Sequence, residues 1–341
     1  MKAAILVWTT VAACGILVAV TLLLVAGQPP IEVLGSALAR FGNPRHLAAS
    51  LEDAAPLLLC ALACSVAMRS GVLNIGGEGQ YLVGMAGAVA MMTTWRGSLP
   101  APVTLVLAAA LAMACGAVWA GLADQLRRRR GVNEVLSTIL LNFIALHLVS
   151  WLVEGPLSDP ATTAPQSATL AEDLRLEPLV RFTSFHIGVI LAVVIAILVW
   201  IGERRTRFGF ECGVVGLNPE AAHAFAIPVE TRRLQAMLIG GALAGLGGML
   251  QLSGVTAQMT ASTRSFGYLG VAVALLGGLH PLGLIAAAAF FALLDGLGRG
   301  MERIHDVPRD LTDIIKGVVL LAALVGGAIL AARRRRQVED A

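Results

Sequence analysis

Charged side chains are scarce in this sequence: Asp, Glu, Lys and Arg make up 14% of its 341 residues. A soluble domain usually carries about 25%, so this chain has too few charges to cover a surface that faces water. Apolar residues make up 57%, and the mean hydropathy is +0.79. These values exclude an ordinary soluble protein and indicate a chain that lies in a lipid bilayer. Since a spanning helix needs about 20 apolar residues, the length allows roughly ten.

The sequence also lacks motifs for nucleotide hydrolysis and other catalysis. A phosphate-binding loop needs a lysine within the pattern G-x-x-x-x-G-K-[ST], and the only two lysines, Lys2 and Lys316, lie in other surroundings. There is no G-x-S-x-G, H-E-x-x-H or paired C-x-x-C motif, and the five cysteines and six histidines are scattered. We therefore expect no ATPase or other enzymatic activity, and no metal or organic cofactor.

Apolar residues form ten segments along the chain, which predicts an all-α, polytopic bundle of transmembrane helices. Three segments are shorter than a full span, and glycines or a His-Pro pair interrupt the chain beside some of them. Such segments are typical of broken and re-entrant helices in transporters, so we expect about 8–10 spans in one transmembrane domain, 1–341. The segments are 4–26, 54–68, 71–94, 101–125, 133–153, 187–201, 236–255, 266–279, 282–298 and 314–332, with interruptions at 71–79 and 280–281.

The first apolar segment raises the question of a secretion signal. The apolar core of a signal peptide has roughly 7–15 residues, and the segment 4–26 is longer. It is preceded by one lysine and no arginine. We therefore expect it to be retained as the first spanning helix.

Basic residues gather at the ends of particular segments and predict the orientation of the chain. Lys and Arg accumulate in the cytoplasmic loops of membrane proteins. With ten spans and a cytoplasmic N-terminus, 15 of the 25 basic residues fall inside, and both termini are cytoplasmic. The dense basic groups are Arg127–Arg130, the set Arg204, Arg205, Arg207, Arg232 and Arg233, and Arg333–Arg336. Because each run of four arginines directly follows a span, we interpret it as a topology signal rather than a nucleic-acid site.

This orientation makes 154–186 the longest external loop and 202–235 a cytoplasmic loop. The external loop holds five acidic residues, two basic residues and several prolines, so it will not cross lipid. Either it covers the outer mouth or meets an external partner, or it is only a solvated connector.

One stretch of the second half echoes the first. The sequence GVNEVLSTIL at 131–140 resembles DVPRDLTDII at 306–315. The predicted topology places these stretches on opposite sides of the membrane, as two inverted repeats would require.

Polar residues stand at the head of the segment that follows the glycine cluster. Asn74, Glu78 and Gln80 lie within GVLNIGGEGQ (71–80). A carboxylate at bilayer depth costs about 2.5–3.5 kcal/mol on insertion scales, so such groups usually face a cavity or a partner. We predict that these residues line a substrate pathway. The alternative is that Glu78 sits at the cytoplasmic interface and only caps a helix.

A second polar group forms a stripe at four-residue spacing. Glu134, Thr138 and Asn142 recur along an otherwise apolar segment, so they share one helix face. In lipid this face must turn inward, either to a pathway or to hydrogen bonds with a neighbouring helix. We assign these residues to the substrate pathway, with helix–helix hydrogen bonding as the alternative.

The predicted cytoplasmic loop contains a short helix at about 218–227. Asn218 before Pro219 forms a favourable N-cap and N1 pair, Glu220 complements the helix dipole, and Pro228 ends the helix. Such a helix of small residues fits a groove on another protein. A loop helix without a partner explains the spacing equally well.

Four ordered stretches together resemble the permease subunits of bacterial ABC importers in the branched-chain amino acid/ribose permease superfamily, nearest to its simple-sugar and nucleoside branch. Leu73, Ala226 and Gly278-Leu279-His280 depart from the usual pattern without removing a charged group. The stretches are GVLNIGGEGQ (71–80), GVNEVLSTILLNFIA (131–145), GVVGLNPEAAHAFAI (213–227) and GVAVALLGGLHPLG (270–283), extended by DLTDIIKGVVLL (310–321).

The resemblance implies a multi-pass permease of a bacterial cytoplasmic membrane that translocates a nucleoside or a related simple sugar-like solute. It implies separate ATP-binding subunits, a second permease subunit, identical or different, and an external substrate-binding protein. In this family the cytoplasmic G-x-N-x-x-A-A segment forms the coupling helix that docks on the ATPase. That role carries over to Gly216, Asn218, Ala221 and Ala222, with Glu220 beside them.

A different class of function needs no partner chain. Glu78 or Glu134 in a spanning segment would suit a secondary transporter of a small polar solute, driven by an ion gradient. Uptake that survives loss of every ATPase subunit but collapses with a protonophore distinguishes this hypothesis from an ABC importer.

Overall fold

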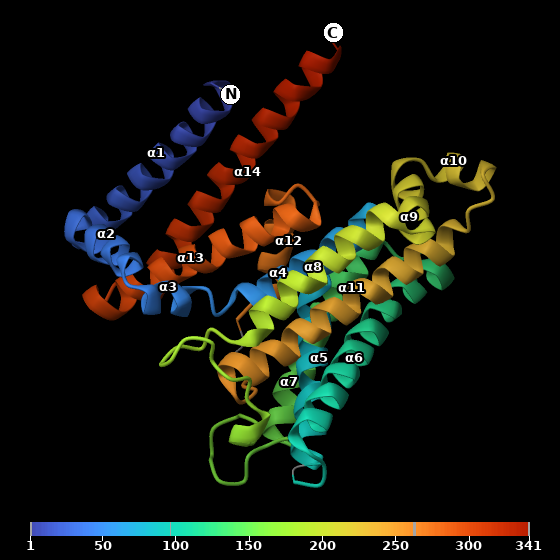
Figure 1. Ribbon diagram of the computed structural model, residues 1–341, viewed down its shortest axis with the longest axis horizontal. Coiled ribbons are helices and arrows are strands. Elements are labelled where there is room, and N and C mark those ends of the chain that lie inside the picture. Colours follow the sequence, from blue (N-terminus) through green and yellow to red (C-terminus); the bar gives the residue numbers. More distant parts are fainter. Residues whose placement is uncertain (1, 96, 262–263, 340–341) are drawn as a thin grey trace. The chain divides into compact units, whose positions relative to one another are not determined.

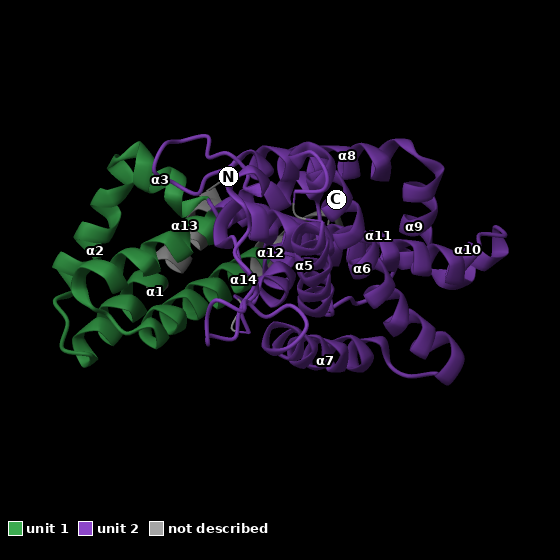
Figure 2. Cartoon of the chain, turned by 90° about the horizontal axis from the view of Figure 1, so that it is seen from below, with its two compact units in different colours: residues 1–51, 290–341 green, residues 52–289 purple. Residues whose placement is uncertain are grey.

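The computed structural model describes residues 2–95, 97–261 and 264–339. Over these ranges the chain is helical or irregular, with isolated β-bridges and no strand. This confirms the all-α prediction. The chain divides into two compact units, one built from residues 1–51 and 290–341 and the other from residues 52–289 (Figures 1 and 2).

Six helical stretches in the described part of the chain are long and apolar enough to cross a membrane. Two shorter apolar helices, Gly15–Val25 and Phe266–Leu276, add to them. Each of the ten apolar segments in the sequence coincides with a helix, which confirms a polytopic bundle. The six stretches are Pro44–Arg69, Ala101–Arg130, Glu134–Glu154, Ile187–Arg205, Val229–Thr256 and Pro281–His305.

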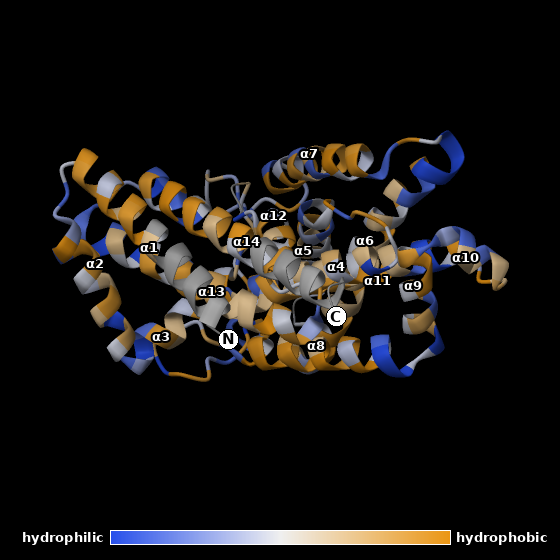
Figure 3. Cartoon of the chain, turned by 90° about the horizontal axis from the view of Figure 1, so that it is seen from above, coloured by the Kyte–Doolittle hydropathy of each residue, from blue (hydrophilic) through white to orange (hydrophobic). Residues whose placement is uncertain are grey.

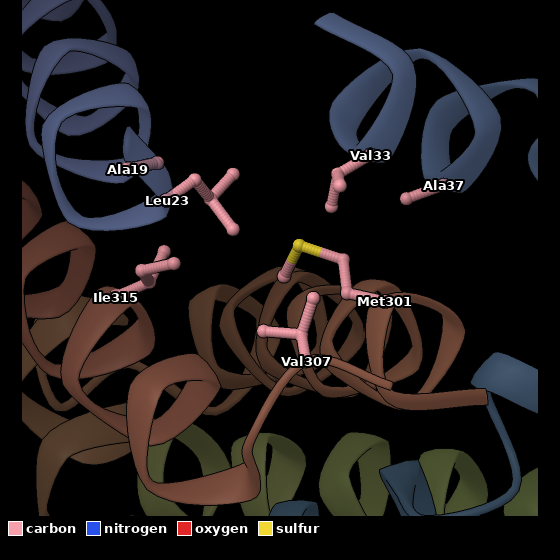
Figure 4. Packing of buried hydrophobic residues seen from close by; sticks show 7 residues of the cluster. All are labelled: Ala19, Leu23, Val33, Ala37, Met301, Val307 and Ile315. Carbon is pink, nitrogen blue, oxygen red and sulfur yellow. The ribbon is translucent and has the colours of Figure 1, made fainter. Parts of the chain in front are cut away.

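The unit that joins the two ends of the chain has its own apolar core. It contains α1 (Lys2–Val25), α2 (Pro30–Ala39), α3 (Pro44–Ser50), the later part of α13 (Pro281–His305) and α14 (Arg309–Glu339). Figure 4 shows Leu23, Val33 and Met301 pointing toward one another. The ten predicted segments leave 30–50 uncovered, whereas the structure has α2 there and α3, which opens the stretch Pro44–Arg69. The core residues are Ala19, Leu23, Val33, Ala37, Met301, Val307 and Ile315.

The larger unit is built on small residues. Its central helices are α5 (Gly77–Thr94), α6 (Ala101–Arg130) and α11 (Val229–Gln251). Every fourth residue of α6 from 108 to 120 is small and buried: Ala108, Ala112, Gly116 and Ala120. Membrane helices lack a hydrophobic driving force toward one another and use such stripes to bring their backbones together.

Glycines form the closest contacts between these three helices. A Cβ atom on Gly116 would lie 3.0 Å from the Cα of Gly245 and would overlap the carbonyl oxygen of Gly241. A Cβ on Gly84 of α5 would likewise overlap Gly245. The backbones of α5, α6 and α11 therefore touch directly, and no side chain fits between them.

A methyl group at Gly116 is expected to weaken the bundle. Because the overlapping atoms belong to the backbone of α11, Gly116→Ala should lower the free energy of unfolding by about 1–3 kcal/mol, measured as a lower melting temperature in detergent. Gly317→Ala is the matched control, because no atom lies within 4 Å of a Cβ at that position. Equal melting temperatures for the two variants would contradict the close packing.

Two interrupted helices begin next to each other inside this unit. After α4 (Ala54–Arg69) the chain runs without helix from 70 to 76, and α5 then starts at Gly77. The interruption lies at the glycine cluster, as the sequence predicted. The short helix α12 (Phe266–Leu276) begins beside it, because a Cβ on Gly77 would lie 3.5 Å from the carbonyl oxygen of Gly267.

The segment between α7 (Glu134–Glu154) and α8 (Ile187–Arg205) is ordered by backbone hydrogen bonds. The amides of Ser167, Leu170 and Leu176 donate to the carbonyls of Met259, Ala257 and Ser253, each at 2.8 Å. The segment therefore lies over the connection that follows α11. The segment therefore packs against its own chain, and the covering role stays a prediction. Figure 1 shows this segment at the opposite end of the larger unit from α9 (Arg207–Leu217) and α10 (Pro219–Ala224).

The sequence echo falls on two helix starts. In each copy the helix begins at the fourth residue of the echoed stretch, at Glu134 for α7 and at Arg309 for α14. The two inverted repeats stay a prediction, and the matching helix starts support it.

Candidate functional site

The polar residues at the break before α5 form a hydrogen-bonded cluster. Asn74 and Gln80 are both buried, and their side-chain amides bond to each other twice. Asn74 Nδ2 donates to Gln80 Oε1 at 3.1 Å, and Gln80 Nε2 donates to Asn74 Oδ1 at 3.0 Å. Asn74 Oδ1 also accepts from the amide of Gly76 at 3.0 Å. The pair thus fixes the backbone at the point where α5 begins.

Asn142 of α7 completes this cluster from a neighbouring helix. Its Oδ1 accepts from the amide of Gly79 at 2.8 Å, and its Nδ2 donates to the carbonyl of Ile75 at 3.0 Å. The first amides of a helix have no partner within the helix. Asn142 therefore caps the N-terminus of α5 and ties α7 to the break.

The other two residues of the α7 stripe lie nearer the start of that helix. Thr138 is buried, and its hydroxyl donates to the carbonyl of Glu134 at 2.8 Å. Glu134 is half-buried and lies eight residues before Asn142, which corresponds to about 12 Å along a helix. The structure brings Thr138 and Asn142 to the break and leaves Glu134 at the N-terminal start of α7.

Glu78 lies in the first turn of α5, but its side chain caps the neighbouring helix α12. Its Oε2 accepts from the amide of Gly267 at 2.7 Å, in the first turn of α12. Ser265, the N-cap residue of α12, makes no side-chain capping bond. A carboxylate is stabilised near the positive end of a helix dipole. Glu78 therefore supplies the cap that α12 lacks.

Two helix N-termini meet at this cluster, in the interior of the larger unit. Asn142 lies about 12 Å along α7, a helix that is long and apolar enough to cross a membrane. Water does not satisfy backbone amides inside a bilayer. Side chains from other elements do so instead: Asn142 for α5 and Glu78 for α12.

Trp119 lies beside this cluster and was not among the residues predicted from the sequence. The buried indole Nε1 of Trp119 has no hydrogen-bond partner among the described residues. A Cβ on Gly79 would lie 2.7 Å from this nitrogen and 3.0 Å from Asn142 Oδ1. Trp119 lies on α6 one position before the small residue Ala120, and no motif pointed to it.

The second candidate site is the loop that contains α10. Asn218 Oδ1 accepts from the amides of Glu220 and Ala221 at 3.0 and 3.1 Å, which confirms the predicted N-cap. The helix is shorter than predicted and ends at Ala224. It ends there because Ala226 adopts a φ of 55°, a left-handed conformation that cannot continue a helix. This conformation also explains why glycine suits that position.

The predicted coupling residues do not all face outward. Gly216, Asn218 and Glu220 are exposed and Ala221 is half-buried. Ala222 is fully buried in a small apolar cluster. Ala222 therefore holds α10 in place and cannot touch a partner. The cluster consists of Val215, Ala222, Ile227 and Val229, with Val214 against it.

Two large apolar residues at the ends of α10 are exposed and were missed. Leu217 is 90% exposed and Phe225 is 77% exposed. Both lie outside the candidate spans. Large apolar side chains that are exposed outside the spans are candidates for contact with another protein.

Ion pairs anchor the helix that leads into α10. Glu211 of α9 is buried and accepts from Arg207 Nε at 2.6 Å and from Arg232 of α11. The hydrogen bond from Arg207, with Arg232 on the other oxygen, lowers the pKa of the Glu211 carboxyl. Arg69, at the end of α4, pairs with Glu203 of α8 at 3.3 Å. The i, i+4 spacing of Arg207 and Glu211 allows this ion pair to be inferred from the sequence. The pairs of Arg232 with Glu211 and of Arg69 with Glu203 join different helices, so no local spacing indicates them.

The sequence of this chain is similar to the sequences of known transport proteins. Residues 46–324 match the family model described as the branched-chain amino acid transport system permease component. A glucose ABC transporter permease of Haloferax volcanii is 35% identical over 285 residues, which cover 80% of this chain and 74% of that protein. A guanosine ABC transporter permease of Bacillus subtilis is 33% identical over 322 residues, 89% of this chain and 91% of the relative. A nucleoside ABC transporter permease of Lactococcus lactis is 29% identical over 320 residues, 90% and 86% of the two chains.

Proposed function

Because this chain belongs to the branched-chain amino acid transport permease family, we propose that it is the subunit of an ATP-driven ABC importer that carries a nucleoside or a related simple sugar-like solute. An ABC permease works with ATP-binding subunits and with a protein that binds the solute. Relatives named for guanosine, nucleosides and glucose support this class of solute. A ring with several hydroxyl groups is common to these compounds.

The observation that carries the proposal is the exposed surface around α10. The chain has no P-loop of its own, so energy from ATP has to arrive through contact with another chain. Leu217 and Phe225 project apolar surface on either side of a helix that Asn218 caps. A groove on an ATP-binding subunit would bury this surface. Glu220 and Ala221 would lie at the same contact.

The arrangement of the loops supports the rest of the assembly. The basic ends of α6 and α8 lie with α9 and α10 (Figure 3), as the positive-inside rule requires of a cytoplasmic face. We therefore place 202–235 in the cytoplasm, together with both termini, and 154–186 outside a bacterial inner membrane. The outer segment would meet the solute-binding protein, and a second permease subunit, identical or different, would complete the pathway.

No observation favours the secondary transporter. An ion-coupled carboxylate has to change partners during transport, and Glu78 is engaged in capping α12. Glu134 lies away from the cluster, at the end of α7.

Uptake of a radiolabelled panel tests the proposal. Cells that express the whole operon should accumulate a nucleoside or a sugar from a panel of guanosine, adenosine, uridine, ribose and glucose. Deletion of the ATP-binding gene should abolish that uptake, and a protonophore should leave it largely intact while ATP levels are maintained. Uptake that persists without the ATP-binding gene and collapses with the protonophore would overturn the proposal.

A further inference from the structure

The helices α9 and α10 form one small rigid body. Val215 of α9, Ala222 of α10 and the following Ile227 share an apolar cluster. The amide of Asn218, the N-cap residue of α10, donates to the carbonyl of Val214 in α9 at 3.0 Å. We therefore expect α9 and α10 to move together when a force is applied at α10.

The end of α9 touches the turn between α4 and α5 through backbone alone. A Cβ on Gly216 would overlap the carbonyl oxygen of Arg69 and would lie 3.1 Å from the amide nitrogen of Gly71. A Cβ on Gly71 would lie 3.3 Å from the Cα of Gly216. Gly71 also has a φ of +78°, a conformation that other residues rarely adopt. Glycine at both positions lets the two backbones meet.

The same turn leads directly into the polar cluster. Only two residues separate Gly71 from Asn74, and the chain between them is not helical. Val72 is buried among Ala120 and Met237, so the segment is held against α6 and α11. Ile75 bonds to Asn142, and Asn74 bonds to Gln80. A shift of the turn must therefore move the groups that fix the start of α5.

The geometry points to the backbone contact of Gly216 with the Arg69–Gly71 turn as the joint through which movement of α10 reaches the break before α5. This inference rests on the proposed docking of an ATP-binding subunit on α10. It makes Gly216 and Gly71 positioning residues, which act through the backbone contact between them. The cluster of Asn74, Gln80 and Asn142 is then the part of the pathway that responds to ATP.

A pair of glycine variants in the same helix tests the joint. In the complete transporter reconstituted in liposomes, Gly216→Ala should lower uptake about tenfold, because its methyl group overlaps the Arg69 carbonyl. ATP hydrolysis should continue, so the ATP consumed per solute transported rises. Gly213→Ala is the matched control: it lies one turn earlier in α9, and its Cβ would meet only Arg69 Nη2, at an ordinary 3.9 Å. An unchanged ratio of ATP to solute in Gly216→Ala would overturn the inference.

Hydrogen exchange on the wild-type complex keeps the inference testable if Gly216→Ala does not assemble. Trapping the ATP-binding subunits with ATP and vanadate should change amide exchange in peptides covering 207–225 and, together with them, in peptides covering 70–80. A change at 207–225 alone overturns the joint and leaves the docking role intact. No change in either segment overturns the docking role itself.

Discussion

Phe225→Asp should lower uptake about 100-fold and release the ATP-binding subunit, while the protein remains in the membrane. Phe225 is 77% exposed, so the substitution disturbs no packing within the chain. Burying an aromatic side chain at an interface contributes about 1.5–3 kcal/mol, and an unpaired carboxylate in its place adds a desolvation cost. Leu217→Asp should act in the same way, because Leu217 is 90% exposed at the other end of α10.

The measurements are uptake and the amount of ATP-binding subunit that copurifies with the tagged chain. Phe182→Asp is the matched control: Phe182 is also a strongly exposed aromatic, at 89%, in the segment at the opposite end of the unit. That variant should retain the ATP-binding subunit at the wild-type level. Normal copurification in both Phe225→Asp and Leu217→Asp would exclude α10 as the docking surface.

A bulky residue at Ala222 does not test docking cleanly, because Ala222 is buried against Val215 and Ile227. Loss of uptake would then follow from disruption of α10 itself. Glu220→Arg and a bulky side chain at Ala221 are better choices, since Glu220 is exposed and Ala221 is half-buried.

Glu78→Ala should reduce uptake at least about tenfold, and Glu78→Gln should retain most of it. The alanine variant leaves the amide of Gly267 without its acceptor in the membrane interior. A buried amide without a partner costs about 1–3 kcal/mol. Glutamine keeps an oxygen at the same place and can still accept that hydrogen bond, so only the contribution of the charge to the dipole of α12 is lost.

The pair of Glu78 variants also separates capping from ion coupling. A carboxylate that carries a proton or binds a cation would be disabled equally by glutamine and by alanine. Uptake and melting temperature should be measured for both, with Asn142→Ala as a companion that removes the cap of α5. Equal loss of transport in Glu78→Gln and Glu78→Ala, at an unchanged melting temperature, would contradict the capping role and revive the secondary transporter.

Local features of the sequence predicted the parts of the site that depend on neighbouring residues. The Asn218-Pro219 pair gave the start of α10, and the side chain of Asn218 bonds to amides two and three residues ahead. The four-residue spacing of Thr138 and Asn142 gave their common buried face on α7. The glycines near residue 77 gave the break before α5. Each of these contacts closes within one or two helical turns, so the spacing is enough to infer it.

Other parts of the site could not be read from spacing. The sequence offered two interpretations of Glu78, a pathway residue and a cap of a helix at the interface, and the structure shows that its side chain caps α12. Trp119, Arg232 and the contact between Gly71 and Gly216 carried no local signal at all.

By itself the sequence determined three properties of this protein: its lipid surroundings, its all-helical fold class and its family. Too few charges and long apolar runs leave only lipid as the surroundings, and helices are the way in which such a chain satisfies its backbone there. Only the tertiary structure decided which groups satisfy the two helix starts inside the bundle. Glu78 and Gly267 are 189 residues apart, and Gly79 and Asn142 are 63 apart. Partners so distant are selected by packing of the whole bundle, which no local pattern records.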